Sequence, residues 1–289
     1  MSLNKKITII SLLILLAIPV GSFWYFRRFQ PNPPPWPPRP EIKITIIPGW
    51  NLRQIAADWI KKGIITAPEE LYKVAGAPVY NYSSYKKQAP VLKFEDASGT
   101  PRFPLLNTKE ANVSYEGYLF PDTYQVYADA KVEDVLKRIF DNLEEKITSE
   151  TRAEIKRQNK TFFEVLIMAS LLEEEVKDES DRAKVADILW RRLARGWARQ
   201  VDSSVHYAVN RTGTVFTTSK ERQVDSLYNT YKYPGLPLGP ISNPGLLAIK
   251  AALYPSPNNY WYFLSDEEGK IHYARTLEEH NLNKAKYLR

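Results

Sequence analysis

TFFEVLIMASLLEEEV, residues 161–176, is a nearly all-apolar run that ends in three consecutive glutamates. Thr161 and Glu164 have the spacing of a capping box, which predicts that a helix begins here. A helix that is apolar on every face is typical of a protein core. Successive side chains on a helix point about 100° apart, so the three glutamates cannot share one environment.

At least one of these carboxyl groups should lean toward the surface that Leu166, Ala169 and Ser170 face. A carboxyl group against apolar neighbours has its ionised form disfavoured, so its pKa rises and it can donate a proton near neutral pH. The local pattern therefore indicates either a general acid or a buried helix whose last turn is solvated. Taken alone it favours the second, because most carboxylates of this kind are structural.

The composition is that of a globular protein, with 44% hydrophobic and 25% charged residues in a chain of 289. A net charge of +7 permits an anionic polymer or a membrane surface as partner. The basic residues are scattered and form no stripe with aromatic residues, so we expect no nucleic-acid partner. The chain has no cysteine, which excludes a thiol nucleophile and a thiolate metal site.

Residues 7–26, ITIISLLILLAIPVGSFWYF, are uncharged and flanked by basic pairs, and they predict a single transmembrane helix. A cleaved signal peptide is the alternative, but its apolar region is usually shorter, and Ala17-Ile18-Pro19 is a poor cleavage site. Residues 30–40, QPNPPPWPPRP, predict a stiff proline-rich spacer. We therefore expect a tail and membrane anchor at 1–29, followed by a linker at 30–40.

The rest of the chain predicts an α+β fold. A strand at 41–47, a helix capped by Asn51 and a helix opened by Thr66 and Glu69 form a small α/β module that needs a further strand to close. Other elements are expected as irregular strands within 77–112, helices at about 132–147, 150–158, 161–176, 180–195 and 243–253, and a hairpin of 260–264 and 271–273. The predicted domains are the module with its extension, 41–112, and a larger mixed α/β domain, 113–289.

Several classes of active site lack their motifs. The three histidines, His206, His272 and His280, have no i,i+4 pairing, so we expect no metal. The sequence has no nucleotide-binding loop, so we expect no cofactor. A serine nucleophile lacks its G-x-S-x-G turn. Carboxylate acid–base chemistry remains. The Gly-, Pro-, Tyr- and Asn-rich loops at 228–245 are typical of sugar- or peptide-binding grooves, or are rigid turns that bind nothing.

Seven short motifs follow one another along the chain: EGYLFPDTY at 116–124, ASLLEEE at 169–175, V-A-x-I-L-x-R-R-L at 185–193, Q-x-D-x-S-V at 200–205, YNTY at 228–231, GLPLGPISNPG at 235–245 and TLEEHN at 276–281. Because these motifs occur in this order and at this spacing, the chain resembles the YceG-like, or MltG, family of endolytic murein transglycosylases. The family's usual Gly-Leu-Pro-Pro-Gly differs here at Leu238. A histidine common near the last hairpin falls on Ile271, which leaves a role for His272 open.

The resemblance implies which residues act and where glycan binds. Its pattern makes Glu173 the catalytic residue and aligns Glu175 with a second glutamate that supports the site. It also implies a LysM-like module at 41–75. The candidates for positioning sugar are Gln200, Asp202, Ser204, Tyr228 and Asn229.

The implied reaction is cleavage of the β-1,4 bond between MurNAc and GlcNAc within nascent peptidoglycan strands, which leaves 1,6-anhydro-MurNAc ends and terminates elongation. Catalysis on peptidoglycan implies a single-pass protein of the cytoplasmic (inner) membrane, with its N-terminus in the cytoplasm and its catalytic domain outside. Peptidoglycan synthases and divisome or elongation proteins are the candidate protein partners. Two alternatives remain: a hydrolytic muramidase that uses Glu173 and Asp202, and a non-catalytic, membrane-tethered glycan-binding scaffold of the cell-wall machinery.

Overall fold

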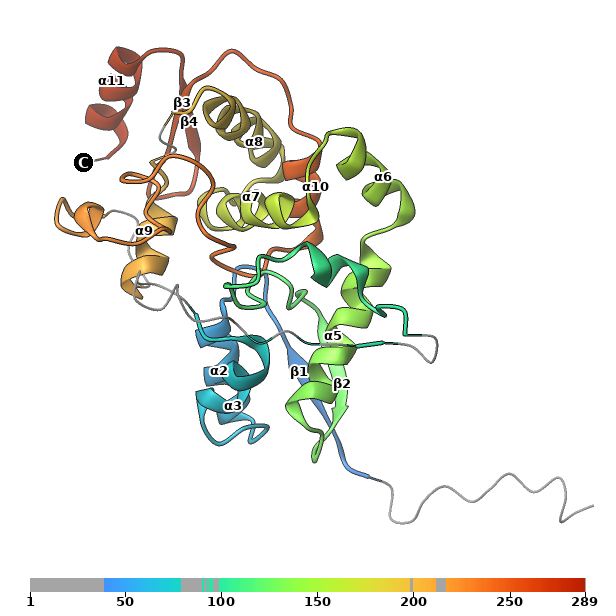
Figure 1. Cartoon of the computed structure of the whole chain (residues 1–289). Helices are drawn as coiled ribbons and strands as arrows, with labels where there is room; N and C mark the ends of the chain where they lie inside the picture. The colour runs from blue at the N-terminus through green and yellow to red at the C-terminus, as the bar shows by residue number, and fades with distance from the viewer. Residues whose placement is uncertain are drawn as a thin grey trace, which may run out of the picture. The chain divides into compact units, whose positions relative to one another are not determined.

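The computed structural model describes residues 39–78, 90, 92, 94–95, 99–197, 200–211 and 217–288. The predicted membrane segment, 7–26, and nearly all of the proline-rich linker lie outside these residues. Among the helices that are described, none is both long and apolar enough to cross a membrane. Residues Ile42–Arg289 form one compact unit (Figure 1).

The first part of this unit contains two helices and a two-stranded sheet. The chain runs from β1 (Glu41–Thr45) through α2 (Leu52–Lys61) and α3 (Pro68–Ala75), and it later forms β2 (Thr123–Tyr127), which pairs with β1. Figure 1 shows the two strands side by side. The strand that the predicted module needs therefore comes from beyond residue 112, on the other side of the predicted domain boundary. The compact unit Ile42–Arg289 runs through residues 112 and 113, where the domain boundary is predicted.

The helix starts follow local hydrogen-bonding signals. Asn51 caps α2 as predicted, accepting hydrogen bonds from the N–H groups of Arg53 and Gln54. The predicted start of α3 is off by one residue, because Glu70 rather than Glu69 reaches back, accepting from the Thr66 N–H at 2.7 Å. The helix starts one residue later than predicted because Pro68 takes its first position, where a residue without an N–H is tolerated.

The second part of the unit is mainly helical. α7 (Phe162–Glu175) is predicted correctly, including its capping box, and its apolar residues are buried on every face. It contacts α6 (Ser149–Arg157), α8 (Glu179–Ala194), α9 (Asp202–Val209), α10 (Leu246–Leu253) and the 3-10 helix η1 (Pro104–Thr108). A central helix surrounded in this way explains why no polar face appears in residues 162–172.

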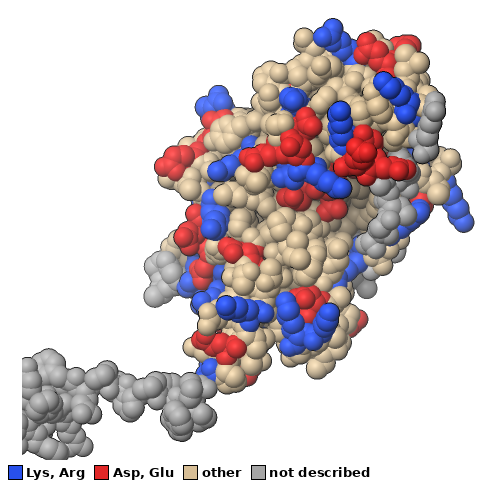
Figure 2. All heavy atoms as spheres, turned by 180° about the vertical axis from the view of Figure 1, so that it is seen from behind, with Lys and Arg blue, Asp and Glu red and all other residues tan. Residues whose placement is uncertain are grey.

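The remaining elements complete a mixed α/β fold. They are α5 (Val132–Lys146), the short 3-10 helix η2 (Glu221–Gln223), the antiparallel hairpin of β3 (Tyr262–Ser265) and β4 (Ile271–Ala274), and α11 (Leu277–Tyr287), which packs on that hairpin. α9 and α11 are missing from the sequence prediction. Of residues 77–112, the described part holds η1 and one isolated bridge, Glu95–Pro101, in place of the irregular strands expected. Acidic and basic side chains are interspersed over the face that Figure 2 shows.

Candidate active site

The three glutamates at the end of α7 enter three different environments, as helix geometry predicts. Glu173 points toward α8 and the start of α10, where Gly245 N–H donates to its Oε2 at 2.8 Å. Its Oε1 accepts from the Arg182 guanidinium at 3.2 Å, and both side chains are nearly buried, with 11% and 8% of their surface exposed. Arg182 also donates to the Val176 carbonyl. Both oxygens of Glu173 thus already have protein donors.

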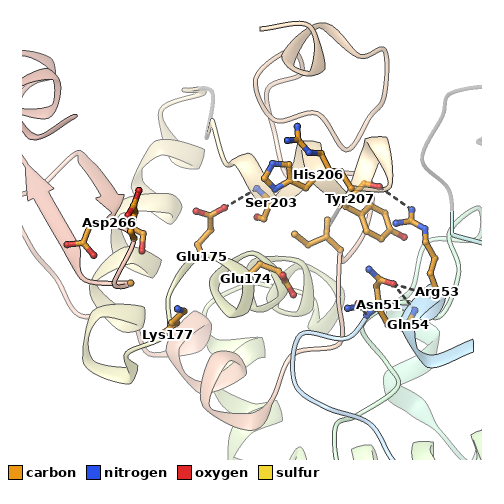
Figure 3. Close-up of a pocket in the computed structure, with 15 residues that line it drawn as sticks. Asn51, Arg53, Gln54, Glu174, Glu175, Lys177, Ser203, His206, Tyr207 and Asp266 are labelled. Atoms are coloured by element: carbon orange, nitrogen blue, oxygen red, sulfur yellow. Dashed lines mark hydrogen bonds between the residues drawn. The ribbon is translucent and has the colours of Figure 1, made fainter. Parts of the chain in front are cut away.

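Glu175 lies on the other side of the helix end, against α9. Its carboxylate accepts the Ser203 N–H at 3.1 Å (Figure 3). Burial raises the pKa of Glu175, and the negative charge of Asp202 raises it further, while the hydrogen bonds from Ser203 oppose the shift. A raised pKa favours the protonated form, from which a carboxyl group can donate a proton to a leaving group.

Two pockets meet at Glu175. One has a volume of about 360 Å³ and the other about 400 Å³, and Glu175 and Ser265 line both. Glu175 therefore lies where a bound chain could extend in two directions. A reacting bond at this carboxyl group would have room for a residue of the polymer on each side.

The first pocket is walled by segments that are far apart in the sequence. Figure 3 shows the start of α2, the end of α7, α9 and the hairpin loop converging on it. The residues on these walls are mainly polar: Asn51, Arg53 and Gln54 from α2 and its cap; Ser203, His206 and Tyr207 from α9; and Ser265, Asp266 and Glu267 from the hairpin. The predicted module thus contributes directly to the pocket that contains Glu175.

Glu174 belongs to this first pocket alone. The residue is exposed, but its carboxyl group faces the pocket rather than open solvent (Figure 3). Partial enclosure by protein raises the pKa of Glu174 to about 7; the charges of Glu175 and Glu173 add to the shift, and a hydrogen bond with Ser242 opposes it. Glu174 is therefore a carboxyl group of the first pocket that titrates near neutral pH.

The second pocket combines aromatic and charged side chains. Its lining includes Gln200, Asp202, Arg222, Tyr231, Tyr262, Phe263 and His280. Asp202 is fixed by hydrogen bonds from Tyr231, at 2.7 Å, and from Thr217, at 2.5 Å. Flat aromatic faces beside polar groups are suited to binding sugar rings.

The predicted sugar-positioning residues divide into two groups. Gln200 and Asp202 line the second pocket beside Glu175, whereas Ser204, Tyr228 and Asn229 are buried and line neither pocket.

These three buried residues hold loops in place. Ser204 donates to the Val201 carbonyl at 2.7 Å, and the Tyr228 ring packs on Tyr207. Asn229 donates to the carbonyls of Arg222 and Val224 and accepts the N–H groups of Tyr231 and Lys232, which folds the YNTY segment onto itself. Sequence composition gives no sign of this, because a self-bonded loop and a binding loop use the same residues.

His272 does not line either pocket in the described part of the chain. It bonds Asp266 at 2.7 Å, and its ring stacks on Tyr287. Asp266 itself faces the first pocket, so His272 can act there only through this carboxylate. No group of three His, Asp or Glu side chains among the described residues could hold a metal ion.

Several residues of the site are not predicted from the sequence: Arg53, His206, Tyr231 and Arg182. Arg53 and His206 lie in short segments with no distinctive motif. Tyr231 ends the YNTY motif, and its hydroxyl donates to Asp202, a contact between segments 29 positions apart that the motif alone does not predict. Arg182 carries a clearer signal, since an arginine on the apolar side of an amphipathic helix needs an acidic partner.

Comparisons with known proteins agree on one family. The sequence model of the YceG-like family matches residues 32–286. The endolytic murein transglycosylase of Bacillus subtilis (strain 168) is 33% identical over 234 residues, which are 78% of this chain and 64% of that protein. The endolytic murein transglycosylase of Streptococcus pneumoniae serotype 2 is 32% identical over 190 residues, which are 63% of this chain and 34% of that protein. The chain thus spans less than two thirds of each of these curated relatives.

A solved structure has the same fold. The crystal structure of a yceG-like protein from Listeria monocytogenes matches with a TM-score of 0.67 and 32% identity, and the match covers 83% of this chain and 75% of that one.

Proposed function

The chain belongs to the YceG-like family, and from this premise we propose that it is a lytic transglycosylase that cleaves MurNAc-β-1,4-GlcNAc bonds within peptidoglycan strands. Cleavage leaves 1,6-anhydro-MurNAc ends and terminates elongation of the strand. Two relatives that carry the name endolytic murein transglycosylase support this reaction.

One observation carries the proposal: Glu175 stands at the junction of two pockets. An endolytic enzyme must hold sugar on both sides of the bond that it breaks, because the bond lies inside the strand. A pocket closed on one side would admit only a strand end. The junction at Glu175 supports internal cleavage.

The family pattern indicates Glu173 as the general acid. We instead assign this role to Glu175. Glu173 would have to release Arg182 or the Gly245 N–H before it could present a protonated oxygen to a substrate. Glu175 has one backbone donor, a raised pKa and access to both pockets. Glu173 then has a different task, which is to fix the end of α7 to α8 and α10.

The reaction needs a single residue that changes role. Protonated Glu175 gives its proton to the glycosidic oxygen, the C1–O4 bond breaks, and positive charge develops at C1 of the muramyl residue. The resulting carboxylate takes the proton of the C6 hydroxyl, and O6 bonds to C1. Water is not consumed, and the acetamido group of the same sugar can shield the charge at C1, so a second carboxylate is not obligatory.

Hydrolysis is the competing reaction, because Asp202 lies in the same pocket as Glu175. A second carboxylate could activate water, as in ordinary glycosidases. Asp202 is held by the hydroxyl groups of Tyr231 and Thr217, an arrangement better suited to orienting sugar than to attacking it.

The same proposal extends to binding and location. We infer that β1, α2, α3 and β2 form a LysM-like unit that holds glycan beside the first pocket. Residues 7–26 would anchor the chain in the cytoplasmic membrane, with the N-terminus inside and the catalytic part outside, near the peptidoglycan synthases and the divisome or elongation proteins.

The products of digestion test the proposal. Purified sacculi and uncrosslinked nascent strands are incubated with the full-length protein in detergent, and the released fragments are analysed by mass spectrometry. Internal fragments with 1,6-anhydro ends are expected. Reducing ends would overturn the lyase assignment in favour of hydrolysis, and no release would leave the protein as a glycan-binding scaffold.

A further inference from the structure

A buried carboxyl group outside the two pockets links their walls. Glu116, in the EGYLFPDTY motif before β2, has only 1% of its surface exposed. Its Oε1 accepts the Leu52 N–H at 2.9 Å and the Asn243 side-chain amide at 3.0 Å. Its Oε2 accepts the same Leu52 N–H at 3.1 Å and the Tyr207 hydroxyl at 3.2 Å. A buried carboxyl group is costly unless it is bonded in this way, so its position is strongly constrained.

Each of its three partners belongs to a segment that reaches the site. Leu52 opens α2, whose first turn lines the first pocket. Tyr207 lies on α9, one turn after the Ser203 N–H that bonds Glu175. Asn243 precedes the Gly245 N–H, which bonds the first of the three α7 glutamates.

Asn243 extends the same linkage to the main chain. Its side chain accepts the Leu119 N–H at 2.9 Å and donates to the Trp50 carbonyl at 2.9 Å, and its backbone N–H donates to Trp50 as well. Glu116 and Asn243 together therefore join α2, the motif before β2, α9 and the loop that leads into α10. Glu116 lies 64, 91 and 127 positions along the chain from Leu52, Tyr207 and Asn243.

We propose that Glu116 is a positioning residue of the active site, which sets the separation of α2, α9 and the 241–245 loop and thereby orients the carboxyl groups at the end of α7. The proposal rests on the function proposed above and adds to it a residue that never touches substrate. The hydrogen-bond frame, rather than a negative charge, carries the effect, because three donors from three segments converge on the two oxygens.

The chemistry of the frame defines two informative variants. In Glu116→Gln, the amide oxygen can still accept from Leu52 and Asn243, and the amide nitrogen can donate to Tyr207, whose hydroxyl can turn to accept it. In Glu116→Ala, the Leu52 N–H loses its acceptor inside the protein, and the Asn243 amide loses one of its two acceptors and keeps the Trp50 carbonyl. Tyr118→Phe is the matched control: it removes a buried hydroxyl bond to Thr108, at 3.0 Å, from the same motif but away from both pockets.

Two measurements on the full-length protein test the proposal, each made well below the melting temperature of every variant. The first is kcat and KM on uncrosslinked glycan strands. We expect Glu116→Ala to lose about 10- to 100-fold in kcat, the scale of an ångström-sized misplacement, with KM nearly unchanged. Glu116→Gln should keep wild-type kcat within about threefold, and Tyr118→Phe should lower the melting temperature without lowering kcat.

The second measurement is hydrogen exchange at the Ser203 and Gly245 amides, which bond the α7 carboxylates. Exchange at both should accelerate in Glu116→Ala and not in Tyr118→Phe. Wild-type kcat in folded Glu116→Ala, an equal loss in Tyr118→Phe, or loss of activity in Glu116→Gln would each overturn the positioning role. Because exchange is read without substrate, an inactive wild-type protein would refute the proposed function and leave this test intact.

Discussion

Replacing Glu173 and Glu175 one at a time by glutamine should separate stability from catalysis. Glu173→Gln removes the charged partner of a nearly buried Arg182 but leaves an oxygen for the Gly245 N–H. A hydrogen bond between charged groups contributes about 1.5–3 kcal/mol. For a folded unit of this size each kcal/mol shifts the melting temperature by about 2–4 °C, so we expect a loss of about 3–12 °C.

The complementary change at Arg182 should cost more. Arg182→Met leaves the Glu173 carboxylate buried with only the Gly245 N–H as donor and also removes the bonds to Val176. Removing one partner of a buried ion pair costs about 3–5 kcal/mol. In the double variant Glu173→Gln/Arg182→Met, the loss should be clearly smaller than the sum, because the two changes remove one shared interaction.

Glu175→Gln should behave in the opposite way. The amide keeps an acceptor for the Ser203 N–H and removes a carboxyl group that burial disfavours, so the melting temperature should hold or rise. Loss of a general acid typically costs about 10²- to 10⁴-fold in rate. The expected pattern is therefore a stable, nearly inactive Glu175→Gln and a less stable, active Glu173→Gln.

Calorimetry and the release of anhydro-muropeptides measure the two effects on the same samples. Activity is compared about 15 °C below the lower melting temperature, so that unfolding does not enter the rates. If Glu173→Gln is inactive while folded and Glu175→Gln keeps wild-type turnover, the reasoning from pocket geometry is refuted and the family pattern correctly names Glu173.

Three further predictions follow from single contacts. Asp202→Asn removes a negative charge that helps to raise the pKa of Glu175. Because the acid must be protonated to act, the basic limb of the kcat–pH profile should move to lower pH. A limb that does not move would mean that another group is the acid. Burial raises the pKa of Glu116 from 4.5 to about 7. The unfolded chain therefore releases this proton at lower pH than the folded protein, and the free energy of unfolding should fall by about 3 kcal/mol as pH rises from about 4.5 to 7. Urea melts at both ends of this range should show a smaller fall in Glu116→Gln than in the wild type, and equal falls would contradict the shift. Thr161→Ala breaks the capping box of α7 and should cost about 1 kcal/mol in a urea melt, with no change in activity per folded molecule.

Features that depend on neighbours in sequence are predictable here. α7 and its capping box, the Asn51 cap and the closing hairpin all follow from residues a few positions apart, and the structure confirms them. α11 is missed because it has no buried residue and therefore no apolar periodicity to detect. α9 is too short for its pattern to be distinctive.

The roles of the three glutamates show where sequence reasoning ends. Helical spacing predicts that they diverge, but not which surroundings each one enters. That outcome depends on Arg182, nine positions away, and on Gly245, seventy-two positions away, both of which bond Glu173. The burial of Tyr228 and Asn229 likewise depends on contacts that no local motif records.

The pairing of β1 with β2 has a consequence for the order of events during synthesis. Ile46 N–H bonds the Asp122 carbonyl at 2.9 Å, so the sheet joins segments about eighty residues apart. A nascent chain therefore leaves the edge of β1 unpaired until residues 123–127 have been synthesised. The sheet can be completed only after this point, although α2 and α3 can already pack on each other.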